Sequence, residues 1–164
     1  MAVSDDLLVI GRQEEVLCFP AFDEATAFAI GSAIRERAAA QNQPIVIDIR
    51  FWDRPLFYAA LPGSKPDNVE WVRRKANLVR RLYKSSYRVV LENRGAEFPF
   101  IRHAMDPADY VLAGGGFPIR INGVGIVGVI VVSGLPERSD HALVVWAVAR
   151  WLGIDEASLA LPPE

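Results

Sequence analysis

The sequence predicts an α/β fold of the α+β kind, a single antiparallel sheet of about five strands with helices packed on its faces. Two β-hairpin patterns, at 44–61 and 114–136, supply four of the strands, and helical patterns alternate with them along the chain. The 164 residues, of which 51% are hydrophobic and 23% charged, fit one globular domain over 1–164 with its core at about 5–155.

The hairpin at 114–136 carries the strongest β signal. Asn122-Gly123 favours a type I′ turn, in which both central residues have positive φ. The run 125–132 is almost entirely apolar, so helices or a partner subunit should cover both faces of this strand. Gly125 and Gly128 inside the strand predict close approach by another backbone or by a ligand.

The first third of the chain predicts five elements, two of which are the strands of the first hairpin. They are an amphipathic helix over Asp5–Leu17 leading into an edge strand at 16–19, a helix capped by Asp23 and running to about Ala40, and strands at 44–50 and 55–61 joined by 51–54. Later in the chain, the sequence predicts a helix over 88–94 that is broken near Gly95, followed by an irregular link at 97–106. A short helix at 107–112 is expected after Asp106. Beyond the second hairpin, a final helix capped by Ser139 or Asp140 is expected to run to Leu152, and the tail at 160–164 is expected to be loose.

A long helix at about 68–84, with Asp67 as its N-cap, has two apolar strips. The core strip consists of Val69, Val72, Ala76, Val79 and Tyr83. The second strip, Trp71, Leu78 and Leu82 beside Lys75, makes the helix more apolar than a lone surface helix, which predicts a subunit contact.

The opposite side of this helix is basic. Arg73, Asn77, Arg80 and Lys84 share a stripe that Arg74 and Arg81 border. The stripe is interpreted either as a solvated face paired with acids or as an anion site for carboxylate or phosphate groups. Because the formal net charge is −2, nucleic acid is not an expected partner.

Catalytic and metal motifs are weak in this chain. Ser133 lacks the elbow of a serine hydrolase, and the glycine run at 114–116 lacks the lysine of a phosphate-binding loop. Two histidines and the single Cys18 give no zinc spacing, and Cys18 is expected to be buried and inert. With no signal peptide and no membrane-length apolar run, the expected location is the cytoplasm, and no membrane contact is predicted.

Several separated motifs resemble an uncharacterised protein family that is grouped with the haem-degrading domain proteins. The motifs are Pro66-Asp67-Asn68, the run from Trp71 to Asn77, Ser85-Ser86-Tyr87, the run from Gly115 to Ile119, the run from Val132 to Pro136, and Asp140-His141. The likeness covers nearly the whole chain. It implies a profilin-like fold, assembly into higher homo-oligomers, and a link to haem by the family's name.

Haem would need an axial ligand, cations for its propionates and an apolar slot. The candidates are His103 or His141 as ligand, the face of Arg73, Arg74 and Arg80 as cations, and Phe117 in the slot. The alternatives to haem ligation are structural: His141 would pack in the core or cap a helix, and His103 would be an exposed loop residue. Any bound haem would therefore be held by one of these two histidines.

The sequence favours a homo-oligomeric binding or scaffold protein over an enzyme. The predicted ligand-binding residues are Arg73, Arg74, Asn77, Arg80, Gly115, Gly116, Phe117 and His141, and the predicted ligand is a small anion. The alternatives are a haem-binding or haem-degrading protein and an adaptor that captures a protein partner through the basic stripe.

Overall fold

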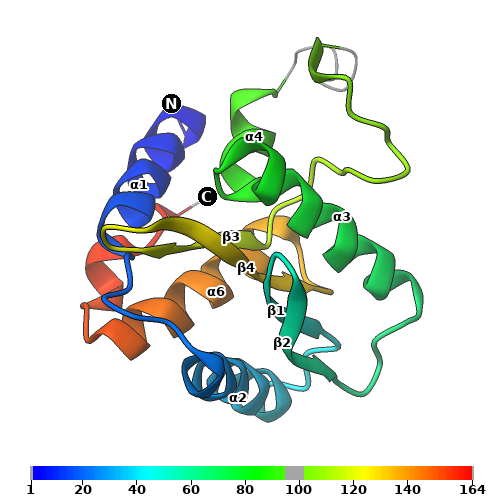
Figure 1. Cartoon of the computed structure of the whole chain (residues 1–164), viewed down its shortest axis with the longest axis vertical. Helices are drawn as coiled ribbons and strands as arrows, with labels where there is room; N and C mark the ends of the chain where they lie inside the picture. The colour runs from blue at the N-terminus through cyan, green and yellow to red at the C-terminus, as the bar shows by residue number, and fades with distance from the viewer. Residues whose placement is uncertain (1, 95–101, 164) are drawn as a thin grey trace.

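The computed structural model describes residues 2–94 and 102–163. It has one four-stranded sheet in the order β2-β1-β4-β3, antiparallel throughout (Figure 1). The strands are β1 (Val46–Phe51), β2 (Arg54–Ala60), β3 (Gly116–Ile121) and β4 (Gly125–Ser133). The predicted α+β class and both hairpins are therefore confirmed.

The expected fifth strand at 16–19 is reduced to one bridge between Phe19 and Ile121. Phe19 donates its N–H to Arg120 O, and Asn122 donates its N–H to Phe19 O. Pro20 follows at once and has no N–H to continue such a ladder. The prediction of about five strands was one too many for this reason.

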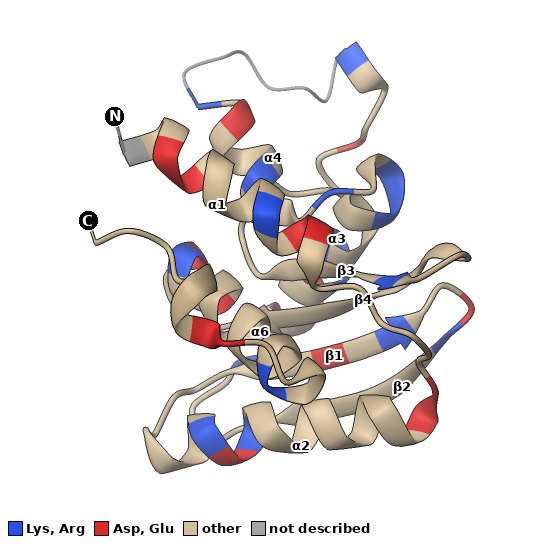
Figure 2. Cartoon of the chain, turned by 90° about the vertical axis from the view of Figure 1, so that its left-hand side faces the viewer, with Lys and Arg blue, Asp and Glu red and all other residues tan. Residues whose placement is uncertain are grey.

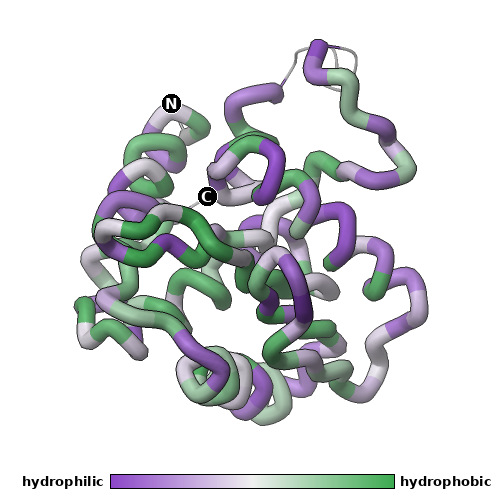
Figure 3. Tube along the Cα trace, viewed as in Figure 1, coloured by the Kyte–Doolittle hydropathy of each residue, from purple (hydrophilic) through white to green (hydrophobic). Residues whose placement is uncertain are grey.

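Helices cover both faces of the sheet (Figure 2). The helices α2 (Glu24–Ala40) and α6 (Glu137–Leu152) pack on one face, and α3 (Asp67–Leu82) packs on the other. Ile30, Ile47 and Ile130 belong to the core under α2 and α6, whereas Val79 and Val129 belong to the core under α3. The expectation that β4 is covered on both faces is confirmed, and Figure 3 shows the mainly hydrophobic colouring of the central strands.

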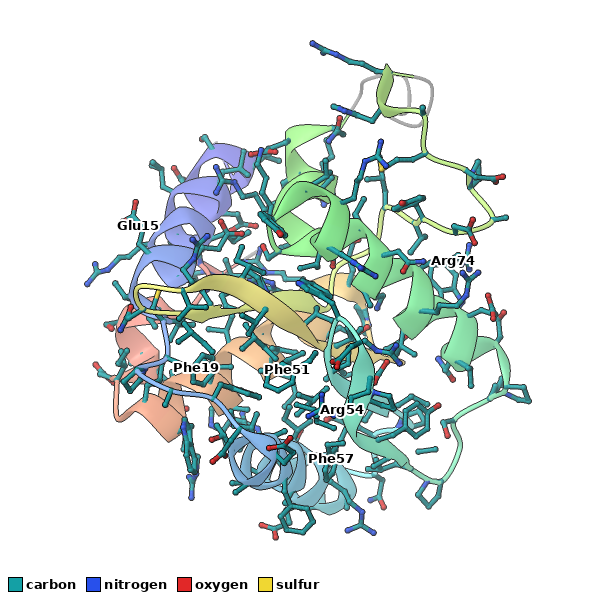
Figure 4. The ribbon with its side chains drawn as sticks, viewed as in Figure 1. Glu15, Phe19, Phe51, Arg54, Phe57 and Arg74 are labelled. Atoms are coloured by element: carbon teal, nitrogen blue, oxygen red, sulfur yellow. The ribbon has the colours of Figure 1, made fainter. Side chains whose placement is uncertain are left out.

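The packing of α2 on β2 depends on a glycine. A Cβ at Gly31 would lie 2.3 Å from the ring of Phe57, so only glycine lets this ring lie against the helix. Phe19 and Phe22 meet edge to face at 4.8 Å on the same side of the sheet. Figure 4 labels Phe19, Phe51 and Phe57, which lie in the region between the sheet and α2.

The β3–β4 turn differs from the predicted type I′ turn. Val124 N–H donates to Ile121 O, and the residues with positive φ are Gly123 (75°) and Gly125 (116°). The loop has three residues, because Ile121 pairs with Gly125. Both strained positions thus fall on glycine, and Asn122 avoids the cost of a left-handed backbone.

The N-cap of α2 is confirmed, and those of α3 and α6 are corrected. Asp23 Oδ1 accepts the N–H of Thr26 at 2.8 Å. Asp67 lies inside α3, where its carboxylate accepts from Trp71 Nε1 at 2.8 Å. The final helix begins at Glu137 after Pro136, so neither Ser139 nor Asp140 caps it.

The two strips of α3 are both covered mainly by the chain itself. Val72, Ala76 and Val79 are buried as predicted. The outer members of the core strip are more than 45% exposed, Val69 at 47% and Tyr83 at 54%. In the second strip, Leu78 is buried in a cluster with Val89 and Met105, whereas Trp71 and Leu82 are half-buried, and the subunit contact on this strip stays a prediction.

The segment after α3 contains α4 (Ser86–Glu92), close to the predicted helix. The predicted break at Gly95 and the start of the link at 97–106 lie outside the described residues. The predicted helix at 107–112 is instead a turn in which Asp109 and Tyr110 donate to Asp106 O. Side chains of α3 bind the carbonyls of Ala108 and Asp109, which are then not used in helical hydrogen bonds.

The C-terminal segment is packed, contrary to the predicted loose tail. A short 3₁₀ turn, η1 (Glu156–Leu159), buries Leu159, whose carbonyl accepts from Gln13 Nε2 at 2.7 Å on α1 (Ala2–Val16). Leu161 packs against the cluster of Ile10, Tyr87 and Leu91. Within the described part of the chain, no helix combines the length and apolar character needed to cross a membrane.

Candidate functional site

A buried ion pair joins α3 to the start of α6. Lys75 Nζ lies 3.0 Å from Asp140 Oδ2, and the two residues are 2% and 1% exposed. Lys75 Nζ also donates to the carbonyl of Val132 at the end of β4, at 3.1 Å. One ammonium group therefore links a helix on one face of the sheet, the sheet itself and a helix on the other face.

Gly115 makes room for this pair. It has a φ of 125°, and a Cβ built on it would lie 2.3 Å from Val132 O and 3.0 Å from Lys75 Nζ. A side chain here would therefore collide with the backbone and displace the ammonium group. The lack of a side chain at Gly115 thus leaves the space that the ion pair occupies.

Burial has opposite effects on the two ionisable groups. Desolvation lowers the pKa of Lys75, although the Asp140 charge opposes this. Desolvation likewise raises the pKa of Asp140 to about 6, against the opposing effects of Lys75 and of the backbone N–H groups. Leu135 N–H donates to Asp140 Oδ1 at 3.0 Å, so both carboxylate oxygens have donors.

A cleft of about 330 Å³ opens beside this pair. The residues that line it come from α3, the segment before β3, the end of β4 and the start of α6; they are Asn68, Trp71, Lys75, Ala113, Ser133, Gly134, Leu135, Glu137 and Asp140. Trp71 forms one wall and carries the guanidinium of Arg74 at 4.9 Å from its ring centroid. This size lies within the range of small-ligand sites.

Three hydrogen-bond donors of the cleft are available to a ligand. An ammonium has three donors, and Lys75 uses two of them, on Asp140 and Val132. Asn68 is oriented by its Oδ1, which accepts Lys65 N–H at 2.8 Å, and its Nδ2 has no partner among the described residues. Ser133 Oγ likewise has no hydrogen-bond partner in 2–94 and 102–163.

The predicted basic stripe lies away from this cleft and mainly holds the segment that follows α4. Arg73 binds Asp109 Oδ1 at 2.9 Å and Ala108 O at 2.7 Å, and Asn77 binds Asp109 O at 2.8 Å. Arg80 is exposed, with its guanidinium 5.7 Å from the ring centroid of Trp52. Of the predicted arginines, only Arg74 therefore stands beside the cleft, through Trp71.

The other predicted residues are distributed between the cleft and the core. Gly115 contacts the ion pair, whereas Gly116 lies against Val79 and Ser86. Phe117 is 1% exposed and belongs to the core. Its ring lies 6.0 Å from that of His141, so these two residues share the interior and not the cleft.

The two histidines have different environments. His141 is fully buried, with Nε2 2.8 Å from Gln13 Oε1, and burial lowers its pKa to about 3. Its Nδ1 has no partner among the described residues. His103 is exposed, as expected, but it lies at the end of a helical turn and not in the predicted irregular loop, and its carbonyl accepts from Arg81 at 2.8 Å.

The side chains of Ser133, Asp140 and His141 do not form a triad, because Asp140 binds Lys75 and His141 binds Gln13. Cys18 is partly exposed, not buried as predicted, and its thiol donates to Glu15 O at 3.3 Å. No group of three or more His, Cys, Asp or Glu side chains with metal-binding geometry occurs in the described ranges.

Sequence reasoning missed the ion pair itself, although a signal was present. Lys75 stands within an apolar strip of α3, and Asp140 stands in a helix with almost no polar face. A charge in such a position must be buried with a partner of opposite sign. The pairing of these two particular residues, 65 positions apart, still required the topology.

Comparison with known proteins identifies the family. The model of the family described as haem degrading protein HbpS-like matches residues 22–149. A UPF0303 protein of Mesorhizobium japonicum is 59% identical over 165 residues, covering 100% of this chain and 99% of that protein. A UPF0303 protein of Brucella ovis is 53% identical over 152 residues, covering 92% and 90% of the two chains.

Solved structures share the fold. The crystal structure of the Ybr137w protein has a TM-score of 0.83 at 24% identity, covering 90% of this chain and 87% of that one. The crystal structure of HbpS has a TM-score of 0.63 at 20% identity, covering 80% and 90%. The haem complex of PduOC has a TM-score of 0.64 at 20% identity, covering 79% and 94%. The resemblance inferred from the motifs is thus confirmed, and the chain belongs to the HbpS-like family, among its uncharacterised UPF0303 members.

Proposed function

We propose that this protein is a non-catalytic, single-domain binding protein that holds a small carboxylate ligand in the cleft beside Lys75 and Asp140. The observation that carries the proposal is the convergence of three available donors, on Lys75, Asn68 and Ser133, around one buried ammonium group. Most of the motifs on which the family resemblance rests contribute residues to this cleft or its walls.

The expected ligand is anionic because the lining offers donors from three different elements. A carboxylate that accepts from the third N–H of Lys75 and from Ser133 replaces water at a partly desolvated charge, where hydrogen bonds are strong. Glu137, at the edge of the cleft, directs one oxygen to Gly114 N–H at 3.3 Å. Its negative charge selects small ligands with a single anionic group over larger polyanions.

Calorimetric titration with acetate, lactate, benzoate and inorganic phosphate tests the proposal. We expect saturable binding of a monocarboxylate at one site per chain. The variants Asn68→Ala and Ser133→Ala should each weaken it roughly tenfold or more, because the loss of one hydrogen bond to a charged group costs about 1.5–3 kcal/mol.

Asn77→Ala is the matched control, because Asn77 lies on the same helix but contacts Asp109 away from the cleft. The affinity of the Asn77→Ala variant for the monocarboxylate should equal that of the unmodified protein. If Asn77→Ala weakens binding and Asn68→Ala does not, the ligand lies on the basic stripe and the proposed cleft site is wrong.

Self-assembly is the second part of the proposal. The tips of both hairpins meet in an apolar hollow lined by Phe51, Trp52, Ile121, Ile126 and Val127, with Asp53 and Arg54 at its edge. Val124 at the adjacent loop is 70% exposed. Such a patch supports burial against a second copy. Light scattering should give a multiple of the 18.1 kDa chain mass, reduced by Val124→Glu but not by Val69→Glu.

Haem is the alternative ligand, supported by the family name and by the haem complex of PduOC. The described residues do not fit a haem held by histidine within one chain. The ring of His141 packs 5.3 Å from that of Tyr87 and 6.0 Å from that of Phe117, and its Nε2 is bonded to Gln13. His103 is exposed and borders none of the main cavities lined by described residues.

Haem titration of the size-defined protein, read at the Soret band, separates the two ligands. We expect no saturable shift at a fixed ratio per chain. A stoichiometric shift that His103→Ala or His141→Ala abolishes would replace the carboxylate proposal with haem binding and would name the axial ligand.

A further inference from the structure

A second cavity lies on the other side of α6 from the Lys75 cleft. It has a volume of about 420 Å³ and is lined by residues of α1, α2, α6, η1 and the segment after η1. Its walls are mainly apolar: Ala142, Val145, Trp146, Ala157, Leu159, Ala160 and Leu161. Gln13, Arg37, Arg138, Ser139 and Glu156 complete the lining.

The charged side chains of this lining differ in whether they already have hydrogen-bond or ion-pair partners. Arg138 is already bound to Asp6 and to the carbonyl of Pro162. Arg37 lies with its guanidinium 4.2 Å from the ring centroid of Trp146, and it has no acidic partner in the described part of the chain. Two arginines against the single Glu156 also leave the lining with a net positive charge. Arg37 is thus the cation available to a ligand.

The walls are held in place by buried polar contacts. Gln13 is 1% exposed and donates to the carbonyl of Leu159, while its Oε1 faces His141 Nε2 at 2.8 Å. These contacts fix the C-terminal segment against α1, so the apolar wall is formed in advance of any ligand. A preformed apolar cavity with a cation at its edge matches the usual chemistry of small-molecule sites.

We propose that this cavity binds an amphipathic monocarboxylate, with its apolar part against Val145, Trp146 and Leu159 and its carboxylate on the guanidinium of Arg37. Arginine presents a planar fork of donors that matches a carboxylate, and its weak hydration suits a position over an aromatic ring. The apolar walls select against the short polar acids expected in the Lys75 cleft. The two sites share no lining residue.

Calorimetry with octanoate tests this site, with octan-1-ol as the neutral probe of the same length. We expect saturable octanoate binding at one site per chain and at least tenfold weaker binding of octan-1-ol, because the charged hydrogen bonds to Arg37 are lost. Arg37→Gln should weaken octanoate binding roughly tenfold. Ala142→Trp, which fills the mouth of the cavity from an exposed helix position, should abolish it.

Arg35→Gln is the matched control, since Arg35 lies on the same helix, is exposed and lines neither cavity. It should bind octanoate normally, as should Asn68→Ala in the other cleft. Equal affinity for octanoate and octan-1-ol, or full binding by both Arg37→Gln and Ala142→Trp, would overturn the proposal without bearing on the Lys75 site.

Discussion

Gln13 and His141 meet in the interior, with Gln13 Oε1 2.8 Å from His141 Nε2. Because the amide oxygen is an acceptor, this nitrogen of the imidazole must carry a hydrogen. The same amide donates through Nε2 to Leu159 O at 2.7 Å. One side-chain contact therefore ties α1 to α6 and, through the other end of the amide, to the C-terminal segment.

The buried His141 should make the protein sensitive to acid. Burial first, and the Arg138 charge second, lower its pKa from 6.5 to about 3 in the folded state. The stabilisation by neutral His141 is fully present above pH 6.5 and is lost as the pH falls toward 3, since the unfolded chain takes up the proton first. In His141→Phe, the free energy of unfolding measured in urea should fall less between pH 7 and 4.5 than in the unmodified protein.

Phenylalanine retains the ring contacts with Tyr87 and Phe117, so packing changes little. It also leaves Gln13 Oε1 without a donor, which lowers stability at every pH by about 1–3 kcal/mol. The informative quantity is therefore the change in the free energy of unfolding between pH 7 and pH 4.5, compared between the variant and the unmodified protein. An unchanged difference would mean that His141 does not titrate differently in the folded and unfolded states.

Removal of one partner of the Lys75–Asp140 pair should lower the free energy of unfolding strongly, whereas removal of both charges together should lower it less. Asp140→Asn leaves the Lys75 ammonium buried without a counter-charge, so the free energy of unfolding at pH 7 should fall by about 3–5 kcal/mol. The double variant Lys75→Met with Asp140→Asn removes both charges and should recover part of this loss. Urea unfolding of the two singles and the double gives the coupling energy, and simple additivity would contradict a strong pair.

The pair also has a pH signature opposite in sign to that of His141. The pKa of Asp140 is raised from 3.8 to about 6 in the folded protein. Its contribution to stability is therefore fully present below pH 3.8 and is lost as the pH rises through 6, because the folded state holds the proton longer.

Sequence patterns predicted the parts of this fold that depend on local periodicity. The Asp23 cap, both hairpins and the cover on both faces of β4 follow from residue spacing alone. The errors occur where a distant segment decides local structure. The carbonyls of Ala108 and Asp109 are taken by α3 side chains, so the expected helix at 107–112 does not form.

The site was predictable only in part for the same reason. The motif segments were recognised, and Gly115, predicted as a ligand-binding residue, lies against the Lys75–Asp140 pair. The basic stripe was conspicuous in sequence, yet Arg73 and Asn77 bind the following loop. The buried Lys75 was concealed among apolar neighbours, and its partner Asp140 was interpreted as a cap, because capping residues and buried acids share a residue type.

Gly128 should tolerate no side chain. A Cβ there would lie 2.1 Å from the carbonyl oxygen of Arg50 on the paired strand β1, so Gly128→Ala must push β1 and β4 apart. We expect a loss of at least about 1–3 kcal/mol in the free energy of unfolding. Gly11→Ala is the control, because nothing lies within 4 Å of its added Cβ in α1, and it should be neutral or stabilising. Equal effects of the two changes would contradict the close strand contact.

Arg73 should order the segment at 106–110 without contributing much to global stability. Its guanidinium binds Asp109 Oδ1 and Ala108 O, but its side chain is 40% exposed, so the ion pair contributes only about 0.2–1 kcal/mol. Arg73→Ala should therefore leave the urea midpoint almost unchanged. It should increase amide hydrogen exchange at Asp109 and Tyr110, which donate to Asp106 O, by roughly two- to fivefold. Arg74→Ala is the neighbouring control, because its guanidinium stacks on Trp71 instead. Faster exchange in both variants, or in neither, would show that Arg73 does not hold this segment.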